Sequence, residues 1–289
     1  MKWRQDYKDM NDYHVHISAK HNPMDLRLGE VWRYRGLIRL FTRRNFTVTY
    51  KQTVLGPAWL FISPLLTSIV YLIIFGRIAD LSTDGTPQLL FYLTGTGVWT
   101  YFSSCVTVNS GTFVNNAHLF GKVYFPRLTI PVSSVLSAAL KLAIQMILVL
   151  VLLAVYMIAG NVSPNFAAWP LVLLEVLQLG LLGMGVGIVI SSLTTKYRDL
   201  SILVSFGVQL WMYASPIVYP LSTVSVGWLR TLLIINPVTA PMEIIRYALL
   251  GKGSIEALPV ILSWVWTAAA ALGGIVLFNR TERTFLDTV

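Results

Sequence analysis

The sequence predicts an all-α integral membrane protein with six transmembrane helices, and two observations support that fold class. Of the 289 residues, 55% are hydrophobic and only 12% are charged, against about 25% charged in an ordinary soluble domain. Long stretches also lack any charged residue, and a helix needs about 20 apolar residues to cross the hydrocarbon core of a bilayer. The uncharged stretches are 52–76, 85–121, 142–174, 200–229 and 257–279.

The chain before the first span divides into two parts, followed by a transmembrane domain over residues 56–289. Residues 1–25 are a polar cytoplasmic extension whose histidines show no metal-binding spacing. Residues 26–55 are expected to carry an amphipathic helix, with an apolar stripe beside a basic stripe. The apolar stripe is Val31, Tyr34, Ile38 and Phe41, and the basic stripe is Arg35, Arg39 and Arg43. A helix with these two faces lies in the membrane interface.

Six apolar segments follow, with turn residues between them. They are Pro57–Phe75, Gln88–Val108, Thr129–Ala159, Trp169–Leu193, Leu200–Tyr219 and Ala257–Phe278. The third segment is too long for one straight crossing. Its first part, around Pro131, is therefore expected to lie near the interface or to be kinked.

The basic residues predict the orientation, because cytoplasmic flanks of membrane spans are enriched in Lys and Arg. Seventeen of the 22 Lys and Arg residues fall in 1–56, 110–128, 194–199 and the C-terminal tail. All four regions lie on one side of a six-span protein. Both termini are therefore expected to be cytoplasmic, and the protein is expected in the bacterial cytoplasmic membrane.

The segment Leu221–Glu256 is too broken to span the membrane and too apolar to be a free loop. It contains Trp228, the run Leu232–Ile235 and the pair Asn236-Pro237. Irregular backbone at membrane depth is tolerated only where protein or a water-filled cavity shields it. A re-entrant pair of short helices on the outer side, before the last span, satisfies that condition.

The cytoplasmic loop Ser110–Leu128 places aromatic residues beside cations. Exposed aromatic and basic side chains favour docking into a groove of a partner protein. Anchoring at the membrane interface is the alternative. The candidate docking residues are Lys122, Tyr124, Phe125, Pro126 and Arg127.

The energy source is expected to lie on another polypeptide, and no catalytic residue is expected here. A phosphate-binding loop needs G-x-x-x-x-G-K-[ST], and the nearest approximation, Gly251–Ser254, has Arg246 where the first glycine belongs. Ion-driven carriers keep ionisable residues at the membrane midplane. The spans hold only Lys141 and Glu175, both nearer a span's end, where reaching to the interface is the expected role.

Composition also argues against two kinds of site. The single cysteine, Cys105, excludes a cysteine-based metal cluster and an internal disulfide. The net charge of +9 is concentrated beside the membrane spans, which points to anionic lipid headgroups rather than to nucleic acid. We expect no metal and no cofactor on this chain.

From Leu28 to Val289 the sequence resembles the membrane subunits of type-two ABC exporters that move polysaccharides, the O-antigen, capsule and teichoic-acid permeases. No single motif is specific, but their order and spacing are. The motifs are Trp32–Arg35, Tyr50–Trp59 with Pro64, Lys122–Arg127, Lys196–Asp199, Gln209–Met212, Ser215–Pro220, Asn236-Pro237, Arg246–Gly251 and Arg280–Asp287. The extension before Leu26 departs from the family pattern.

The resemblance implies a homodimer of six-helix subunits that encloses a channel, with two cytoplasmic ATPase subunits bound below. ATP and Mg would be held by those partner subunits. The loop Ser110–Leu128 would then carry the main coupling helix, and its docking residues would contact the ATPase. The segment Leu221–Glu256 would be the re-entrant pair near the outer exit.

A polysaccharide pathway favours aromatic side chains, because the flat C–H faces of sugars stack on aromatic rings without tight binding. Packing against lipid or at the interface is the alternative for each ring. The candidate pathway residues are Trp59, Phe61, Trp99, Tyr101, Phe102, Trp211, Tyr213 and Tyr219. A polyprenyl-diphosphate-linked substrate also needs cations near the inner mouth. The candidates are Arg44, Lys51 and Arg127.

The function predicted from these features is the permease subunit of an ATP-driven exporter of a lipid-linked or nascent cell-surface polysaccharide. Its expected partners are a second copy of itself, the ATPase, membrane lipid and the polyprenyl-linked polymer. Two alternatives stay open. One is an exporter of the same fold for a small drug or lipid, and the other is a membrane-embedded glycosyl- or acyltransferase, which would need clustered carboxylates or a His-Asp pair near one interface.

Overall fold

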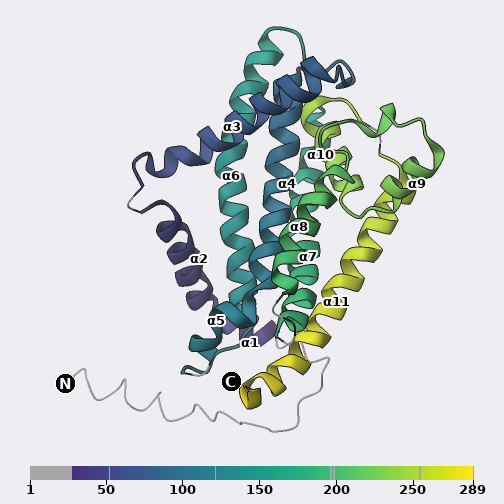
Figure 1. Ribbon diagram of the computed structural model, residues 1–289. Helices are drawn as coiled ribbons and strands as arrows, with labels where there is room; N and C mark the ends of the chain where they lie inside the picture. Colours follow the sequence, from purple (N-terminus) through teal and green to yellow (C-terminus); the bar gives the residue numbers. More distant parts are fainter. Residues whose placement is uncertain are drawn as a thin grey trace.

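The protein is an all-helical bundle, as the composition predicted. The computed structural model describes residues 28–51, 53–120, 122–195, 197, 199–253 and 255–288, with the side chains of residues 28 and 282–288 left out. Within these ranges the chain forms helices and turns and contains no β-strand. Several long helices run side by side along the molecule (Figure 1). The extension 1–25, Lys196 and Arg198 lie outside the described residues.

Four helices of the described part are long and apolar enough to cross a membrane. They match four of the predicted spans in order. The first joins η1 (Gly56–Ala58), α3 (Trp59–Tyr71) and the π-helical η2 (Leu72–Ile78); the second is α6 (Thr129–Ile158); the third joins η3 (Phe166–Ala168) and α7 (Trp169–Thr194); the fourth is the Ala257–Thr281 part of α11 (Ala257–Thr288).

The first part of the third span was expected to lie near the interface or to be kinked around Pro131, and its helix has no break there. Helix α6 runs without a break for 30 residues, or about 45 Å at 1.5 Å per residue. Pro131 is the third residue of the helix, where its missing N–H and fixed φ are tolerated because first-turn donors have no partner within the helix. The extra length therefore extends beyond one bilayer thickness.

Helix α4 (Gln88–Ser110) is the centre of the bundle. It packs against α3, α6, α7 and α8, and two of its rings, Tyr92 and Phe102, are fully buried. Helix α4 is not among the four helices named above and is less apolar than α3, α6 and α7. Its threonines satisfy their hydroxyls on the helix itself, as where Thr94 donates to the Leu90 carbonyl at 2.8 Å and Thr96 to the Tyr92 carbonyl at 2.7 Å. Protein rather than lipid surrounds this helix, so it need not be strongly apolar.

Helix α7 approaches its neighbours through glycines. A Cβ added at Gly185 would lie 2.6 Å from the backbone carbon of Ala270 on α11, and one at Gly187 would lie 2.8 Å from the Val106 carbonyl oxygen on α4. Contacts this short exclude any side chain. Small residues let membrane helices pack backbone to backbone, and α7 thereby fastens α11 to the bundle.

Helix α8 (Leu200–Tyr213) is shorter than the predicted span, which was expected to reach Tyr219. Its 14 residues measure about 21 Å. The helix ends two residues before Ser215-Pro216, because the residue preceding a proline disfavours helical backbone. A turn segment then leads to η4 (Leu221–Thr223).

The amphipathic N-terminal helix is present but divided into α1 (Leu28–Arg33) and α2 (Arg35–Tyr50). The division falls at Tyr34, whose backbone is not helical (φ −87°, ψ 20°). Val31 and Ile38 are buried as expected, whereas Tyr34 is exposed and does not belong to the buried stripe. Helix α2 packs along α6 and keeps its arginines exposed.

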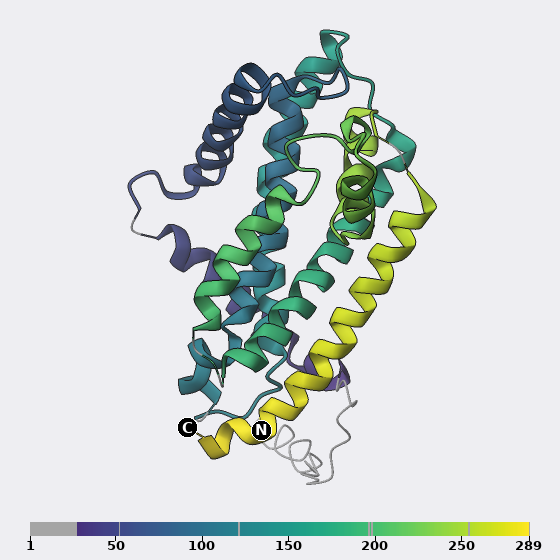
Figure 2. The same cartoon turned by 45° about the vertical axis from the view of Figure 1, so that its right-hand side comes forward.

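Before the last helix lie α9 (Gly227–Ile235) and α10 (Thr239–Leu250), bent against each other by 88°. The bend falls at Asn236-Pro237, inside the segment for which a re-entrant pair was predicted. The pair lies at the opposite end of the molecule from α1 and from the C-terminal end of α11 (Figures 1 and 2). We refer to these as the α9–α10 end and the α1 end.

Candidate functional site

The predicted coupling loop forms a short helix, α5 (Thr112–Phe120), at the α1 end of the molecule (Figure 1). Its aromatic residues face inward and join a second hydrophobic core, the inner-end cluster. This cluster consists of Phe113, Phe120, Phe125, Ile130, Ile188 and Phe278. The ring of Phe113 lies 4.6 Å from that of Phe278 on α11. Movement of α5 is therefore coupled by packing to α7 and α11.

The five predicted docking residues divide into exposed and buried groups. Lys122 and Tyr124 are exposed, the latter by 73%, and Pro126 is half-buried. Phe125 is buried, with its ring 6.0 Å from Phe41 on α2 and 5.9 Å from Phe120. A ring buried among its own helices is not available for a partner. The surface suited to docking is therefore Lys122, Tyr124 and the exposed side of α5.

Arg127 was predicted both for docking and for the inner mouth, but it is buried at 8% exposure. Its guanidinium lies 5.2 Å from the centre of the Phe120 ring. Sequence reasoning missed the inner-end cluster because its contacts join α2, α5 and α11, which are far apart in the chain. The apolar stripe of α2 was the signal available in the sequence, because an apolar helix face must pack against another surface.

The other two cations predicted for the inner mouth lie on and beside α2. Arg44 and Lys51 are exposed, and the Arg44 guanidinium lies 5.0 Å from the centre of the Phe41 ring. The Lys141 amine of α6 lies 5.8 Å from the centre of the Tyr50 ring at the end of α2. These three cations thus flank the C-terminal half of one helix.

The eight predicted pathway aromatics do not share one surface. Trp99, Tyr101 and Phe102 are buried inside the subunit, within α4. Trp59 and Tyr213 are exposed, while Phe61, Trp211 and Tyr219 are partly buried. Burial against other helices of the same subunit gives the α4 rings a packing role here. A sugar-lining role for the other five stays a prediction.

Glu175 was expected to reach the interface, and that expectation is wrong. Its side chain is 2% exposed on α7, and its Oε2 atom has no hydrogen-bond partner among the described residues. One turn further, Gln178 donates hydrogen bonds to the Ser263 hydroxyl at 2.7 Å and the Thr267 hydroxyl at 3.4 Å, both on α11. The α7–α11 interface therefore carries a buried polar layer.

At the α9–α10 end, a buried ion pair fixes α10. Arg246 and Glu243 are almost fully buried, 3.3 Å apart. Arg246 also donates a hydrogen bond of 2.7 Å to the Ile217 carbonyl oxygen, and its guanidinium lies 3.9 Å from the centre of the Phe91 ring on α4. The Leu221 backbone N–H donates to Glu243 at 3.4 Å. The pair thus joins α10 to α4 and to the segment after α8.

A second connection at this end is exposed. The Ser222 hydroxyl lies 2.9 and 2.7 Å from the two carboxylate oxygens of Asp84. Arg230 on α9 pairs with Glu256 at 3.3 Å, and both side chains are largely solvated. The ion pair of α9 is therefore exposed, whereas that of α10 is buried.

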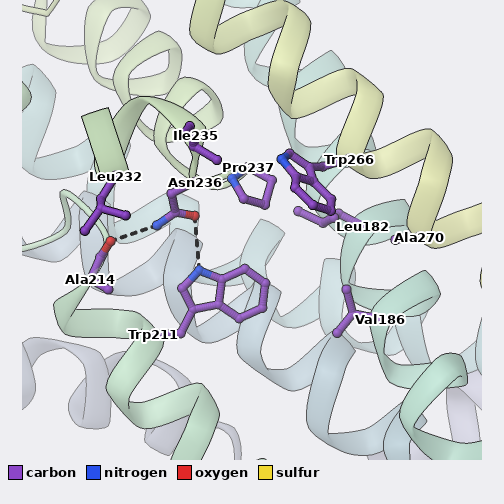
Figure 3. A pocket seen from close by; sticks show the side chains of 10 residues that line it. All are labelled: Leu182, Val186, Trp211, Ala214, Leu232, Ile235, Asn236, Pro237, Trp266 and Ala270. Atoms are coloured by element: carbon purple, nitrogen blue, oxygen red, sulfur yellow. Dashed lines mark hydrogen bonds between the residues drawn. The ribbon is translucent and has the colours of Figure 1, made fainter. Parts of the chain in front are cut away.

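A lateral groove separates α8 from α11, with α7 as its floor and α9 at one end (Figure 3). Its volume is about 470 Å³, and it is open on one side. The lining residues are Leu182, Val186, Trp211, Ala214, Leu232, Ile235, Asn236, Pro237, Trp266 and Ala270. A second open cavity of about 430 Å³ shares Val186, Trp211 and Ala214 and continues along α8 past Val204 and Gly207.

The polar groups in the middle of the groove bind one another. The Trp211 indole N–H donates to the Asn236 side-chain oxygen at 3.1 Å, and the Asn236 amide nitrogen donates to the Ala214 carbonyl at 2.8 Å (Figure 3). The same amide nitrogen also donates to the Ser215 hydroxyl at 2.8 Å. The Val238 backbone N–H also donates to Asn236, at 3.1 Å. Apart from the indole N–H of Trp266, the remaining lining side chains are apolar. The groove therefore offers a largely apolar surface at this level.

No group of three or more metal-ligating side chains occurs within the described ranges.

Comparison with known proteins gives a consistent picture. Residues 36–250 match the family model described as ABC-2 type transporter. The chain is 27% identical over 254 residues to the O-antigen export system permease protein RfbA of Klebsiella pneumoniae, covering 87% of this chain and 94% of that relative. It is 28% identical over 216 residues to the protein of the same name from Myxococcus xanthus, covering 74% and 80%.

Proposed function

The chain belongs to the ABC-2 type transporter family, and we propose that it is the permease subunit of an exporter that moves a lipid-linked or nascent cell-surface polysaccharide across the membrane. The protein is a multi-pass protein of the bacterial cytoplasmic membrane. The proposal for the substrate rests on one observation, that relatives named O-antigen export permeases align with 87% and 74% of the chain. An O-antigen, capsule or teichoic-acid type of polymer fits that relationship.

We propose a six-span topology in which α3, α4, α6, α7, α8 and α11 cross the membrane. The α1 end is then cytoplasmic, because it carries α5, the arginines of α2 and the end of α11 and because Lys and Arg concentrate on cytoplasmic flanks. The α9–α10 pair is then re-entrant from the outer side. Its bend at Asn236-Pro237 is shielded by Trp211, as irregular backbone at membrane depth requires.

In this proposal two ATPase subunits, which hold ATP and Mg, dock at the α1 end of a dimer of this chain. The exposed face of α5, Lys122 and Tyr124 form the contact. The inner-end cluster transmits the movement, since the stacked rings of Phe113 and Phe278 join α5 to α11. Arg44, Lys51 and Lys141 are the cations available to a diphosphate headgroup at the inner mouth.

Deletion of the gene tests the function. The expected result is loss of surface polysaccharide with polymer accumulating inside the cell, restored by the intact gene. Unchanged surface glycan with altered drug sensitivity would replace this proposal with export of a small molecule. The purified chain alone is expected to hydrolyse no ATP, and hydrolysis would show that the energy source is not on a partner.

A further inference from the structure

We infer that the lateral groove between α8 and α11 holds the hydrocarbon tail of the lipid that carries the exported polymer. This inference rests on the proposed function. It assigns a binding site for the part of the substrate that must stay in the bilayer while the glycan passes through the protein.

The chemistry of the lining selects an apolar occupant over a sugar. The Trp211 N–H and both ends of the Asn236 amide are already hydrogen-bonded within the protein. The Trp266 indole N–H is the one further polar group among the lining side chains. Sugar hydroxyls placed against Leu182 and Val186 would lose their hydrogen bonds to water without replacement, which is unfavourable. A hydrocarbon chain has no hydrogen bonds to lose, and the burial of each methylene group contributes favourable free energy to binding.

The position of the groove brings it into contact with lipid. Its floor, α7, and one wall, α11, are both long and apolar enough to cross a membrane. Its open side is edged by large exposed apolar residues, with Trp266 49%, Leu232 57% and Leu210 52% exposed. A lipid chain can therefore enter sideways from the bilayer without crossing a polar surface.

Helix α8 relates the groove to the proposed transport route. Val204, Gly207, Val208 and Trp211 line the cavities, and this spacing puts them on one face of the helix. The opposite face is exposed at Ile202, Phe206 and Tyr213, where a second subunit would enclose the channel. A tail in the groove therefore lies one helix away from a glycan in that channel.

The groove can be filled without disturbing the fold. A Cβ added at Gly207 meets no atom within 4 Å, although Gly207 lines the cavity. Gly273 on α11 is equally open but does not line either cavity. The variants Gly207→Phe and Gly273→Phe therefore add the same ring to a helical glycine. Gly207 lines the second cavity, which continues the groove along α8, whereas Gly273 lines neither cavity.

The test uses this chain purified with its ATPase in nanodiscs of phosphatidylethanolamine and phosphatidylglycerol. The probe is a polyprenyl phosphate with a diazirine on its chain, and labelled peptides are identified by mass spectrometry. Labelling is expected on α7, α8 and α11 beside the groove, and excess unlabelled polyprenyl phosphate should compete. Gly207→Phe should weaken labelling roughly tenfold, which corresponds to lost burial of about two methylene groups. Gly273→Phe and Gly207→Ala should label normally.

Three results would overturn the inference. Labelling that excess polyprenyl phosphate does not reduce, with equal labelling by a diazirine phospholipid, would assign the groove to bulk lipid. Absence of labelling with cross-links between copies of the chain would assign it to the dimer contact. Full labelling of a folded Gly207→Phe variant, as judged by its melting temperature, would place the tail elsewhere. Unchanged surface glycan in the deletion strain would refute the proposed function alone, since the labelling needs no transport.

Discussion

The Arg246 guanidinium of α10 donates a hydrogen bond of 2.7 Å to the carbonyl oxygen of Ile217, and this contact joins the bent pair to the turn after α8. Arg246 also pairs with Glu243, and both are buried. Removing one partner of such a pair leaves the other charge buried without compensation. The contact is therefore structural and should be sensitive to truncation.

Arg246→Ala is expected to destabilise the protein by roughly 3–5 kcal/mol, because it isolates Glu243 in the interior. Arg230→Ala is the matched control, since its pair with Glu256 is exposed and such pairs contribute about 0–1 kcal/mol. Thermal unfolding in detergent checks both. Similar melting temperatures for the two variants would show that the buried pair does not hold α10.

Phe125→Ala is expected to lower the melting temperature and Tyr124→Ala to leave it unchanged. Phe125 is buried between Phe41 and Phe120, and removing a buried aromatic ring costs about 3–5 kcal/mol. Tyr124 is exposed, so its loss should instead reduce the amount of ATPase that co-purifies with the chain. Normal co-purification with Tyr124→Ala would count against the docking surface.

Gly185→Ala is expected to destabilise the α7–α11 contact, since its Cβ would lie 2.6 Å from the Ala270 backbone. Gly207→Ala offers the comparison, because its Cβ meets open space and alanine favours a helix by about 1 kcal/mol over glycine. Melting temperatures should therefore shift in opposite directions. A tolerated Gly185→Ala would mean that α11 can move outward without cost.

Glu175→Gln is expected to be neutral or stabilising, with export unchanged. The buried Glu175 has an unpartnered carboxylate oxygen within the described structure, and an uncharged amide avoids the cost of burying a charge. Gln178→Glu, one turn away, should destabilise by roughly 1–3 kcal/mol because it removes the donor to the Ser263 hydroxyl. Loss of export in Glu175→Gln at normal stability would reveal a functional carboxylate.

The sequence predicted best what depends on apolar length. The uncharged stretches identified α6, α7 and α11, because a bilayer imposes both length and composition on a span. The end of α8 was misjudged at Tyr219, although Ser215-Pro216 already carried the local signal for an earlier stop. The resemblance to polysaccharide permeases is confirmed at the level of the family.

The side-chain predictions failed where contacts join distant parts of the chain. Phe125 and Arg127 lie in a loop that was expected to be exposed, but both are buried. Phe125 packs against Phe41 of α2, and Arg127 lies over the Phe120 ring of α5. Trp99 and Phe102 carry aromatic rings of the kind that stack on sugars, yet their helix, α4, lies at the centre of the subunit. The lateral groove was not predictable, because it depends on how far α8 and α11 stand apart on α7.

The modest hydropathy of α4 bears on how the protein is made. A nascent segment enters the bilayer on its own when hydrocarbon is a better solvent for it than water, and α4 is less apolar than α3, α6 and α7. The stable insertion of α4 in the membrane should then depend on neighbouring helices that leave the insertion machinery together with α4 or after it. Truncation of the chain before α6 is thus expected to leave α4 poorly inserted in the membrane, although the deleted residues follow α4 in the sequence.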